Sequence, residues 1–419
     1  MKTITVIKNN KVLKGTLKLP SSKSLSSRLL IIRALSQDQF LINNLSEADD
    51  TLLLQGLLEK IRHRKSMQSY VELDTANAGT AMRFLTAYLT FIPGKWILTG
   101  SERMKQRPIG ILVEAMRSLG AEIEYLGKLG YPPLMIKGRP VKGGEITVDA
   151  GISSQFISAL LLIAPTLPGG LSIHLQGQAV SFPYIDMTLR LLKYFGIEAV
   201  KERNIIFVPE ATIKCSDFIV EADWSAASFW YEAAAMADEV DLILEGLQKE
   251  SLQGDAVLAD IFQNFGIMSE FHKNGVRLKK VKKKLDDYYF DFSDYPDIAP
   301  AVITTCAALG LSGRFEGLKS LRIKETDRLR ALKHEYKKLG LNLEPDSPGD
   351  MMPKIEFSNP QFKSSADLRI DTYGDHRMAM TFAPLSIILG TIRIENPDVV
   401  SKSYPQYWEH LLSLGFEIV

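Results

Sequence analysis

One arrangement of hydrophobic and polar positions recurs six times along the chain. In each copy, a short strand with alternating side chains leads through a small polar cluster into a strongly apolar helix. The copies cover residues 17–33, 71–88, 146–164, 218–235, 290–308 and 368–385. Alternation with a period of two is typical of a strand, and a helix that is apolar nearly all round is typical of a domain interior. Because the copies are spaced by about seventy residues, we expect one βαβαβ unit built six times.

Most copies continue with a second strand and an amphipathic helix. The second strands end near Gly100, Gly177, Gly246 and Gly317, and five of the amphipathic helices close on Gly120, Gly196, Gly266, Gly340 and Gly415. A glycine directly after a helix supplies the left-handed C-cap. Between residues 62 and 68 the first copy is short and polar. We therefore expect that unit to be trimmed.

Six units around one core would exceed the usual size of a single core, so the pattern predicts two α/β domains of three units each. The chain begins and ends with strand-like segments, residues 3–8 and 416–419. We expect the first strand to complete the last domain. The predicted domains are residues 1–19 with 224–419 and residues 20–223, with an active site in the cleft between them.

The composition narrows the functional class. The chain is 46% hydrophobic and 24% charged with a formal net charge of +1, so no global field favours nucleic acid or an anionic membrane. Cys215 and Cys306 are too few for a disulfide framework or a structural zinc site, and we expect both to be small core residues. The longest apolar run, residues 156–167, is short for a membrane span, and the N-terminus lacks the apolar core of a signal peptide. A cytoplasmic enzyme or binding protein without a metal is expected.

The polar cluster of the first copy, residues 20–28, places hydroxyls and two cations at the start of an apolar helix. Unpaired N–H groups and a partial positive charge at a helix N-terminus favour phosphate or carboxylate. Lys23, Ser24 and Arg28 are therefore candidate anion-binding residues. Capping serines with solvated charges are the alternative. Arg28 stands in an apolar stretch and needs a partner.

The next two copies repeat this design with fewer charges. Asn77, Gly79 and Thr80 open the second apolar helix, and Arg103, Lys105 and Arg107 crowd the start of the following helix. Like charges at a helix start destabilise it unless an anion binds. The third copy offers uncharged groups that serve as caps or as contacts to sugar or ring hydroxyls: Ser153, Ser154, Gln155, Ser181 and Tyr184.

Carboxylates join the cations in the second half of the chain. Asp297 precedes an apolar helix as either an N-cap or a base. Glu325 and Arg328 lie within one helical turn beside Lys324, which surface ion pairing also explains. The remaining candidates are Asp375, His376, Arg377 and Lys402, of which His376 is also compatible with a core histidine. A cleft that holds an anionic ligand pair beside proton-transfer groups explains the whole distribution.

Several strings resemble one known family across essentially the whole chain. They are LPSSKSLSSR, NAGTAMR, RMKQRPIG, SSQF, PYIDMTL, IKETDRL, DHRMAM and SKSYP. The chain is similar to 5-enolpyruvylshikimate-3-phosphate (EPSP) synthases. The resemblance implies transfer of the enolpyruvyl group of phosphoenolpyruvate to the 5-hydroxyl of shikimate 3-phosphate, with release of phosphate and without a cofactor. It also implies a monomer and the two-domain, inside-out α/β barrel of six βαβαβ repeats.

The resemblance assigns roles position by position. It implies that Asp297 is the base for the 5-hydroxyl and that Glu325 delivers the proton to the methylene carbon, with Lys23 as a further participant. The implied phosphoenolpyruvate-binding residues are Lys23, Asn77, Gly79, Thr80, Arg107, Gln155, Arg328, Arg377 and Lys402. Those implied for shikimate 3-phosphate are Lys23, Ser24, Arg28, Ser153, Ser154, Gln155, Ser181, Asp297 and Lys324. Tyr184, Asp375 and His376 are implied as supporting residues.

Five positions depart from the family pattern: Ser22, Ser27, Ala76, Phe84 and Ser320. They affect the expected substrate affinity and the expected inhibition by glyphosate, for which Gly79 leaves room. Two alternatives remain. The sister transferase that acts on UDP-N-acetylglucosamine relies on a cysteine, and no cysteine here precedes Cys215. A non-catalytic relative that binds a phosphorylated metabolite is the other.

Overall fold

The computed structural model describes residues 2–64, 69–177, 179–341, 343, 352–363 and 368–419. The chain forms two compact units, each described by itself. Unit 1 comprises Met1–Ser22, Glu47–Asp49 and Glu221–Val419, and unit 2 comprises Lys23–Ser46 and Asp50–Val220. The predicted domains, 1–19 with 224–419 and 20–223, differ from these units by three residues at each crossover (19 against 22, 223 against 220). They also did not separate residues 47–49 from their neighbours.

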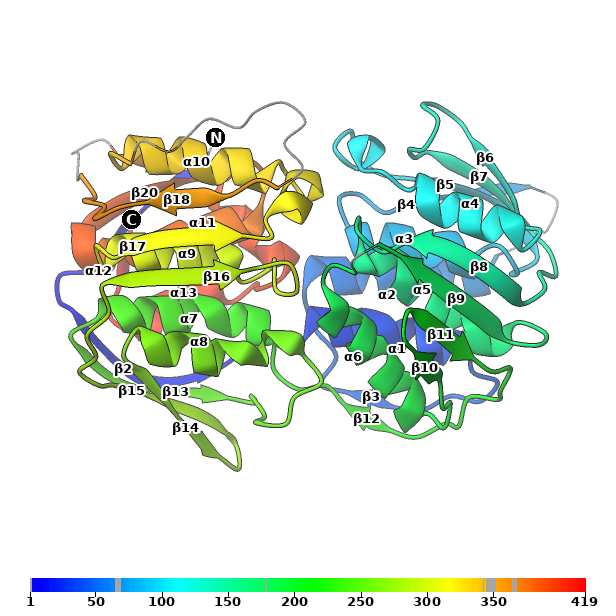
Figure 1. The fold of residues 1–419 in the computed structure, drawn as a ribbon, viewed down its shortest axis with the longest axis horizontal. Helices are drawn as coiled ribbons and strands as arrows, with labels where there is room; N and C mark the ends of the chain where they lie inside the picture. The colour runs from blue at the N-terminus through cyan, green and yellow to red at the C-terminus, as the bar shows by residue number, and fades with distance from the viewer. Residues whose placement is uncertain (1, 65–68, 178, 342, 344–351, 364–367) are drawn as a thin grey trace. The chain divides into compact units, whose positions relative to one another are not determined.

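Three buried helices form the interior of unit 1 and pack against one another (Figure 1). They are α7 (Trp224–Met236), α9 (Ala299–Ala308) and α11 (His376–Phe382). Every residue of α11 is buried, as are nearly all of α7 and α9. A helix that is apolar on all sides is stable only when it is covered on all sides. The prediction of interior helices is therefore confirmed for this unit.

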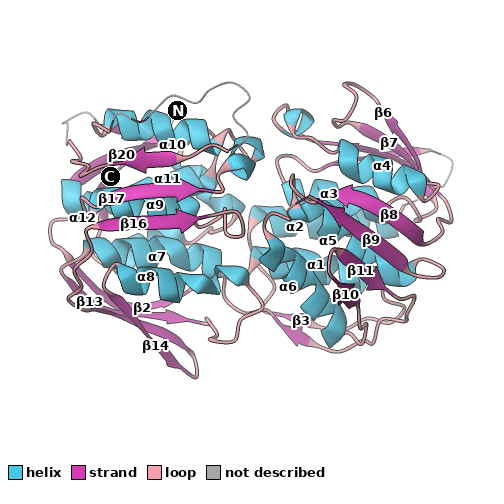
Figure 2. Ribbon diagram, in the orientation of Figure 1, coloured by secondary structure: helices cyan, strands magenta, loops and turns pink. Residues whose placement is uncertain are grey.

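Three sheets surround the helices of unit 1, and strands lie in front of α9 and α11 in the view of Figure 2. One sheet has the order β19 (Arg369–Ile370), β20 (Thr391–Glu395), β1 (Thr3–Ile7) and β21 (Glu417–Ile418). The second has β14 (Ile267–His272), β15 (Gly275–Lys280), β13 (Glu239–Glu245) and β2 (Val12–Lys18). The third has β16 (Asp287–Asp291), β17 (Ser312–Glu316) and β18 (Ile355–Phe357).

Further helices complete unit 1. The α-helices are α8 (Leu258–Asn264), α10 (Arg328–Lys338), α12 (Ser386–Leu389) and α13 (Tyr407–Ser413). The 3₁₀ helices are η3 (Gly254–Val257), η4 (Lys319–Ile323), η5 (Ala383–Leu385) and η6 (Pro397–Lys402). Of these, η6 packs against α11 and η3 against α7. Both 3₁₀ helices thereby lie beside a helix of the interior.

Unit 2 repeats the same plan. The mutually packed interior helices are α1 (Lys23–Leu35), α3 (Gly79–Tyr88) and α5 (Ser154–Ile163). The outer helices are α2 (Asp49–Arg62), α4 (Gly110–Ser118) and α6 (Phe182–Tyr194), with η1 (Met104–Gln106) and η2 (Ala164–Thr166). One four-stranded sheet has the order β4 (Tyr70–Asp74), β5 (Gly94–Thr99), β7 (Leu134–Gly138) and β6 (Glu122–Tyr125). Another has the order β10 (Val200–Glu202), β11 (Ile205–Val208), β9 (Leu171–Gln176) and β8 (Gly144–Asp149). A third pairs β12 (Phe218–Ile219) with β3 (Ile42–Asn43).

The two crossovers exchange strands between copies of the repeat. Strand β2 belongs to the first copy, yet it pairs in parallel with β13 of the fourth copy in unit 1. Strand β12 opens the fourth copy, yet it pairs in parallel with β3 in unit 2. The predicted single unit over residues 17–33 is therefore divided between the two units. The prediction that the first strand completes the last domain is confirmed, because β1 pairs with both β20 and β21.

The five glycines predicted to end amphipathic helices all have positive φ, between 75° and 92°. Each follows its helix by one or two residues, so the C-cap prediction is confirmed.

Cys306 is buried as expected, whereas Cys215 is exposed and its predicted core location is wrong. Residues 65–68, within the segment predicted to be trimmed, lie outside the described part of the chain. Across the described ranges, no helix combines the length and the apolar character that crossing a bilayer requires.

Candidate active site

In unit 1 most of the candidate residues lie together at the N-terminal ends of α9, α10 and α11. Asp297 lies two residues before α9, and Arg377 is the second residue of α11. Lys324 and Glu325 lie between η4 and α10, and Arg328 is the first residue of α10. The loops that start these helices therefore bring together three cations and several carboxylates that are far apart in sequence.

Arg328 is the centre of this cluster, with a side chain that is only 1% exposed. Its guanidinium nitrogens lie 2.9 Å from the carboxylate of Asp375, 3.0 Å from that of Glu325 and 3.6 Å from that of Asp297. Burial lowers the pKa of Arg328, but the charges of Asp375 and Glu325 outweigh it, so the pKa lies above its ordinary value. This buried cation is therefore compensated by three carboxylates.

Asp297 faces three cations. Its carboxylate lies 3.1 Å from the ammonium of Lys324 and 3.4 Å from the guanidinium of Arg377, which also donates to the main-chain oxygen of Asp297 at 2.7 Å. Burial alone would raise the pKa of Asp297, but the charges of Arg377, Lys324 and Arg328 outweigh it. The pKa therefore lies well below its ordinary value, and the carboxyl is firmly ionised.

The structure decides between several alternatives that the sequence left open. Asp297 does not cap α9, whose N-cap is Ile298. Glu325 and Arg328 form a buried pair rather than a surface pair. His376 is only 2% exposed, with its Nδ1 atom 3.7 Å from Asp375. Lys402 is the last residue of η6, the 3₁₀ helix that packs against the interior helix α11.

In unit 2, Arg28 occupies the interior between α1, α5 and α6. Its guanidinium donates to the hydroxyls of Thr188 (2.8 Å) and Ser158 (3.0 Å) and to the main-chain oxygens of Ser24 and Tyr184. Burial lowers the pKa of Arg28 to about 10, so it stays charged at neutral pH. The partners that the sequence required for this arginine are neutral oxygens.

Lys23, at the first position of α1, has a partner that the sequence did not identify. Its ammonium lies 3.0 Å from the carboxylate of Asp50 in α2, and the two side chains are 18% and 12% exposed. The sequence feature that could have indicated this partner is the acidic segment Glu47–Asp50 at the start of an amphipathic helix. Carboxylates there also interact favourably with the helix dipole. A half-buried lysine with an acidic partner has a fixed ammonium position.

Gly79, the first residue of α3, lies directly under the guanidinium of Arg107. A Cβ atom at Gly79 would lie 2.6 Å from Nη2 of Arg107, so any side chain there would require the guanidinium to shift. Arg107 itself is buried. Beside them, the amide of Gln155 donates to the hydroxyl of Thr80 at 3.2 Å. The structure thus brings together Gly79 with Arg107 and Thr80 with Gln155.

The remaining polar candidates of unit 2 have backbone roles. The Ser153 hydroxyl accepts from the main-chain N–H of Gln155 at 3.3 Å and caps α5. Ser181 is buried and has a left-handed backbone with φ +57° at the start of α6. Asn77 lies two residues before α3, and Ser154 is the first residue of α5.

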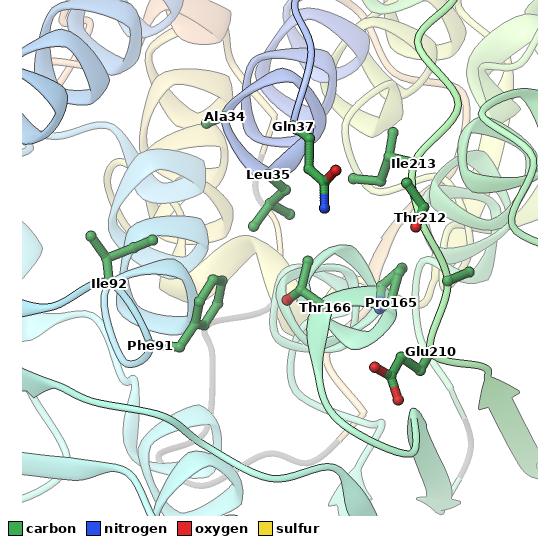
Figure 3. Close-up of a pocket in the computed structure, with 11 residues that line it drawn as sticks. Ala34, Leu35, Gln37, Phe91, Ile92, Pro165, Thr166, Glu210, Thr212 and Ile213 are labelled. Carbon is green, nitrogen blue, oxygen red and sulfur yellow. The ribbon is translucent and has the colours of Figure 1, made fainter.

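A cavity of about 620 Å³ lies elsewhere in unit 2 (Figure 3). Its walls come from the C-terminal end of α1 (Leu35), the segment after α3 (Phe91) and η2 (Pro165), together with Glu210 and Ile213. The candidate residues Lys23, Gly79 and Ser154 lie at the opposite, N-terminal ends of these interior helices. No predicted site residue lines this cavity. Elsewhere in the described ranges, no three His, Cys, Asp or Glu side chains gather in a way that could hold a metal.

The fold is that of the enolpyruvyl transferases. A solved EPSP synthase from Acinetobacter baumannii matches with a TM-score of 0.78 at 23% identity, covering 100% of both chains. The fold class predicted from the sequence, a two-domain inside-out α/β barrel of six repeats, is confirmed.

The sequence identifies the family within that class. The model of the family described as EPSP synthase (3-phosphoshikimate 1-carboxyvinyltransferase) matches residues 7–411. A 3-phosphoshikimate 1-carboxyvinyltransferase of Bacteroides fragilis (strain YCH46) is 46% identical over 408 residues, which cover 97% of this chain and 96% of that protein. Another of that name from Sulfurovum sp. (strain NBC37-1) is 38% identical and covers 99% and 100%. The chain belongs to the EPSP synthase family, as the resemblance predicted.

Proposed function

We propose that this protein transfers the enolpyruvyl group of phosphoenolpyruvate to the 5-hydroxyl of shikimate 3-phosphate and releases phosphate, a step of aromatic amino acid biosynthesis. The observation that carries the proposal is the family match over residues 7–411. The name 3-phosphoshikimate 1-carboxyvinyltransferase, borne by relatives at 46% and 38% identity, supports the same reaction. Both substrates are phosphorylated, and the buried cations of both units suit anionic ligands.

The residue roles belong to the proposal. Lys23, Arg107 and Lys402 bind the phosphate of phosphoenolpyruvate, and Arg328 and Arg377 bind its carboxylate. Asn77, Gly79, Thr80 and Gln155 complete that set. Lys23, Gln155 and Asp297 also contact shikimate 3-phosphate, which is otherwise bound by Ser24, Arg28, Ser153, Ser154, Ser181 and Lys324. Tyr184, Asp375 and His376 support these residues.

Substrate binding must change the ion pairs of unit 1 before Asp297 can act as a base. With Lys324, Arg328 and Arg377 beside it, the pKa of Asp297 lies well below its ordinary value, and such a carboxylate is a poor proton acceptor. Anionic substrates compete for the same cations. When they engage Arg377 and Lys324, the stabilisation of ionised Asp297 weakens and its basicity rises.

The same exchange prepares Glu325 as an acid. Its carboxylate is now 3.0 Å from Arg328, and an ion-paired carboxylate does not hold a proton readily. When the carboxylate of phosphoenolpyruvate binds Arg328, Glu325 loses part of this pairing and is protonated more easily. Asp375 keeps Arg328 in position during the exchange, because its carboxylate contacts Nε at 2.9 Å as well as the Nη2 atom that Glu325 contacts.

The chemistry then proceeds in two stages. Glu325 gives its proton to the methylene carbon, C2 becomes electrophilic, and the 5-hydroxyl oxygen adds while Asp297 takes its proton. In the tetrahedral intermediate, the C–O bond to phosphate breaks, a proton returns from the methyl carbon to Glu325, and the double bond reforms. Lys23, Arg107 and Lys402 stabilise the charge on the departing phosphate.

A phosphate-release assay with shikimate 3-phosphate and phosphoenolpyruvate tests the reaction. We expect release with this pair and none when UDP-N-acetylglucosamine replaces shikimate 3-phosphate. Asp297→Ala and Glu325→Ala should lower turnover by about 10²–10⁴-fold with an unchanged circular dichroism spectrum. Glu356→Ala, which removes an exposed carboxylate of β18, is the matched control. No release by the wild-type protein would refute the reaction, and near-normal rates in the first two variants would refute the roles.

Three further expectations belong to this proposal. Glyphosate should compete with phosphoenolpyruvate, with weakened inhibition because the bulky Phe84 lies buried in the helix that starts at Gly79. An inhibition constant as weak as that of insensitive enzymes would refute this. Light scattering should give a monomer near 46.8 kDa, and cell fractionation should place the protein in the cytoplasm.

A further inference from the structure

Tyr373 lies in the turn between β19 and α11, two residues before Asp375. Its backbone is left-handed, with φ +52°, and Gly374 follows with φ +68°. Large side chains rarely adopt this conformation, which persists only where surrounding contacts hold it. The main-chain N–H of Tyr373 donates to the carboxylate of Asp371 at 2.7 Å. That of Asp375 donates to the main-chain oxygen of Thr372 at 2.8 Å. A tyrosine in this turn calls for a reason in its side chain.

The hydroxyl of Tyr373 contacts two residues of α10. It donates to the carboxylate of Glu335 at 2.5 Å, and its oxygen lies 2.6 Å from Nδ1 of His334. Glu335 is fully buried, whereas His334 is exposed. Burial, followed by the hydrogen bond to Glu335, raises the pKa of Tyr373, so the hydroxyl keeps its proton and remains a donor. Hydrogen bonds to carboxylates are among the stronger ones in proteins.

This hydrogen bond is the middle one of three contacts that join α10 to the chain leading into α11. The contacts are Arg328 with Asp375 (2.9 Å), Glu335 with Tyr373 (2.5 Å) and Lys338 with the main-chain oxygen of Arg369 (3.1 Å). Positions 328, 335 and 338 share one side of α10 at 3.6 residues per turn. Their partners follow in the reverse order along the chain. The turn before α11 is therefore fastened along α10 and not only at its start.

The turn positions the arginines through Asp375. The carboxylate of Asp375 contacts the guanidinium of Arg328 and also accepts from the main-chain N–H of Arg377 at 2.9 Å. Without the hydroxyl of Tyr373, the left-handed turn loses the side-chain contact that holds it against α10. Asp375 would then be free to move with the turn. Groups that bind a ligand have to be held within about 0.5 Å of the productive geometry.

We propose that Tyr373 is a positioning residue whose hydroxyl, held by Glu335, fixes the turn before α11 and so keeps Arg328 and Arg377 in the geometry that binds a carboxylate. The inference rests on the proposed function, in which that carboxylate belongs to phosphoenolpyruvate. Tyr373 itself does not touch the substrate and acts through the two arginines. Its loss should therefore affect phosphoenolpyruvate more than shikimate 3-phosphate.

The test uses Tyr373→Phe in the full-length protein, which removes the hydroxyl and keeps the ring. Tyr289→Phe is the matched control. The hydroxyl of Tyr289 also donates to a carboxylate of unit 1, that of Glu316 at 3.1 Å, but on the exposed surface of β16 and β17. Both variants thus lose the same atom and the same kind of hydrogen bond.

Steady-state kinetics give the first readout. In Tyr373→Phe the KM for phosphoenolpyruvate should rise by about tenfold, because misplacing a binding group by about 1 Å costs up to about 10²-fold. The KM for shikimate 3-phosphate should change less, and Tyr289→Phe should match the wild type. A purely structural role would lower the fraction of active protein, and hence kcat, while leaving both KM values unchanged.

Hydrogen exchange gives a second readout that needs no turnover. The main-chain N–H groups of Asp375 and Arg377 are both hydrogen-bonded within the turn and the helix cap. In peptides that cover residues 371–380, exchange should be about tenfold faster in Tyr373→Phe, since local opening no longer breaks the hydrogen bond to Glu335. The wild type and Tyr289→Phe should exchange at the same rate.

The two readouts together decide the proposal. Unchanged exchange in Tyr373→Phe would overturn it whatever the activity. Faster exchange with an unchanged KM for phosphoenolpyruvate, or with an equal rise in both KM values, would also overturn it, because the turn would not position the two arginines. If the wild type released no phosphate, the proposed function would fail, and the exchange rates would decide the inference by themselves.

Discussion

The guanidinium of Arg328 lies 2.9 Å from the carboxylate of Asp375, and both side chains are withdrawn from solvent, at 1% and 0% exposure. The second carboxylate oxygen of Asp375 accepts from the main-chain N–H of Arg377 at 2.9 Å and caps α11. One carboxylate thereby holds two of the arginines that we assign to phosphoenolpyruvate. The arrangement of the cluster depends on it.

Asp375→Ala should destabilise unit 1 by about 3–5 kcal/mol, because it leaves Arg328 buried without its main partner and removes a helix cap. Urea unfolding followed by tryptophan fluorescence measures this, since Trp224, Trp230 and Trp408 all belong to unit 1. Asp398→Ala is the control, because Asp398 pairs with Lys2 on the surface and exposed pairs contribute less than about 1 kcal/mol. Equal losses of unfolding free energy in the two variants would contradict the structural role of Asp375.

Gly79→Ala should impair phosphoenolpyruvate binding. The added Cβ atom would lie 2.6 Å from Nη2 of Arg107 and displace the guanidinium. Because misplacing a binding group by about 1 Å costs up to about 10²-fold, kcat/KM for phosphoenolpyruvate should fall by about 10–10²-fold while the KM for shikimate 3-phosphate changes less. Steady-state kinetics measure both constants. An unchanged KM for phosphoenolpyruvate would show that Arg107 does not bind it.

Gly56→Ala should stabilise the protein without affecting turnover. Gly56 is an exposed residue within α2, and a Cβ atom there would meet nothing within 4 Å. Alanine is favoured over glycine in a helix by about 0.5–1 kcal/mol. Thermal unfolding should show a raised midpoint for the transition of unit 2. The variant also serves as the control for Gly79→Ala, since both make the same substitution in a helix.

Glu232 should make stability fall as pH rises. It lies in α7 with no exposure, and neither carboxyl oxygen has a hydrogen-bond partner among the described residues. Burial raises its pKa well above the ordinary value, so the stability it contributes is complete below the unfolded-state pKa and is lost as pH rises toward the folded-state pKa. Between the two values the loss is about 1.4 kcal/mol per pH unit.

Glu232→Gln removes this titration, so its free energy of unfolding should gain on the wild type as pH increases. Urea unfolding at several values between about pH 5 and 9 measures the difference. Glu239→Gln is the comparison, because Glu239 is an exposed carboxylate just after the same helix. A wild-type protein whose stability tracked that of Glu232→Gln at every pH would rule out the effect.

The interior helices and the glycine caps of the amphipathic helices could be predicted because both signals are local. A run such as that of α9 is apolar on every face, and Gly340 or Gly415 follows its amphipathic helix within two residues. The exchange of β2 and β12 could not be predicted, because it depends on pairing between segments more than one hundred and seventy residues apart. Alternation specifies a strand but not its neighbour.

Site residues could be predicted where a charged residue stands in an apolar segment. Their partners could not be predicted where those partners are residue types common in helices. Arg28 stands in an apolar helix, so the sequence predicted that it has a partner. Nothing in the sequence distinguishes its partners Thr188 and Ser158 from other hydroxyl residues in helices. Nor does anything in the sequence indicate that the hydroxyl of Tyr373 reaches Glu335. That contact follows only from the packing of α10 against α11.

The pairing of β1 constrains how the protein is made. Register places Thr3 opposite Glu395 and Val6 opposite Ile418, so β1 finds its neighbours in the sheet only after residues 391–418 have been synthesised. Until then this strand has two unpaired edges, which favours aggregation in slowly assembling chains. A chain arrested before residue 391 contains every strand of the unit 2 sheets, whereas β1 of unit 1 still lacks both of its neighbours, β20 and β21.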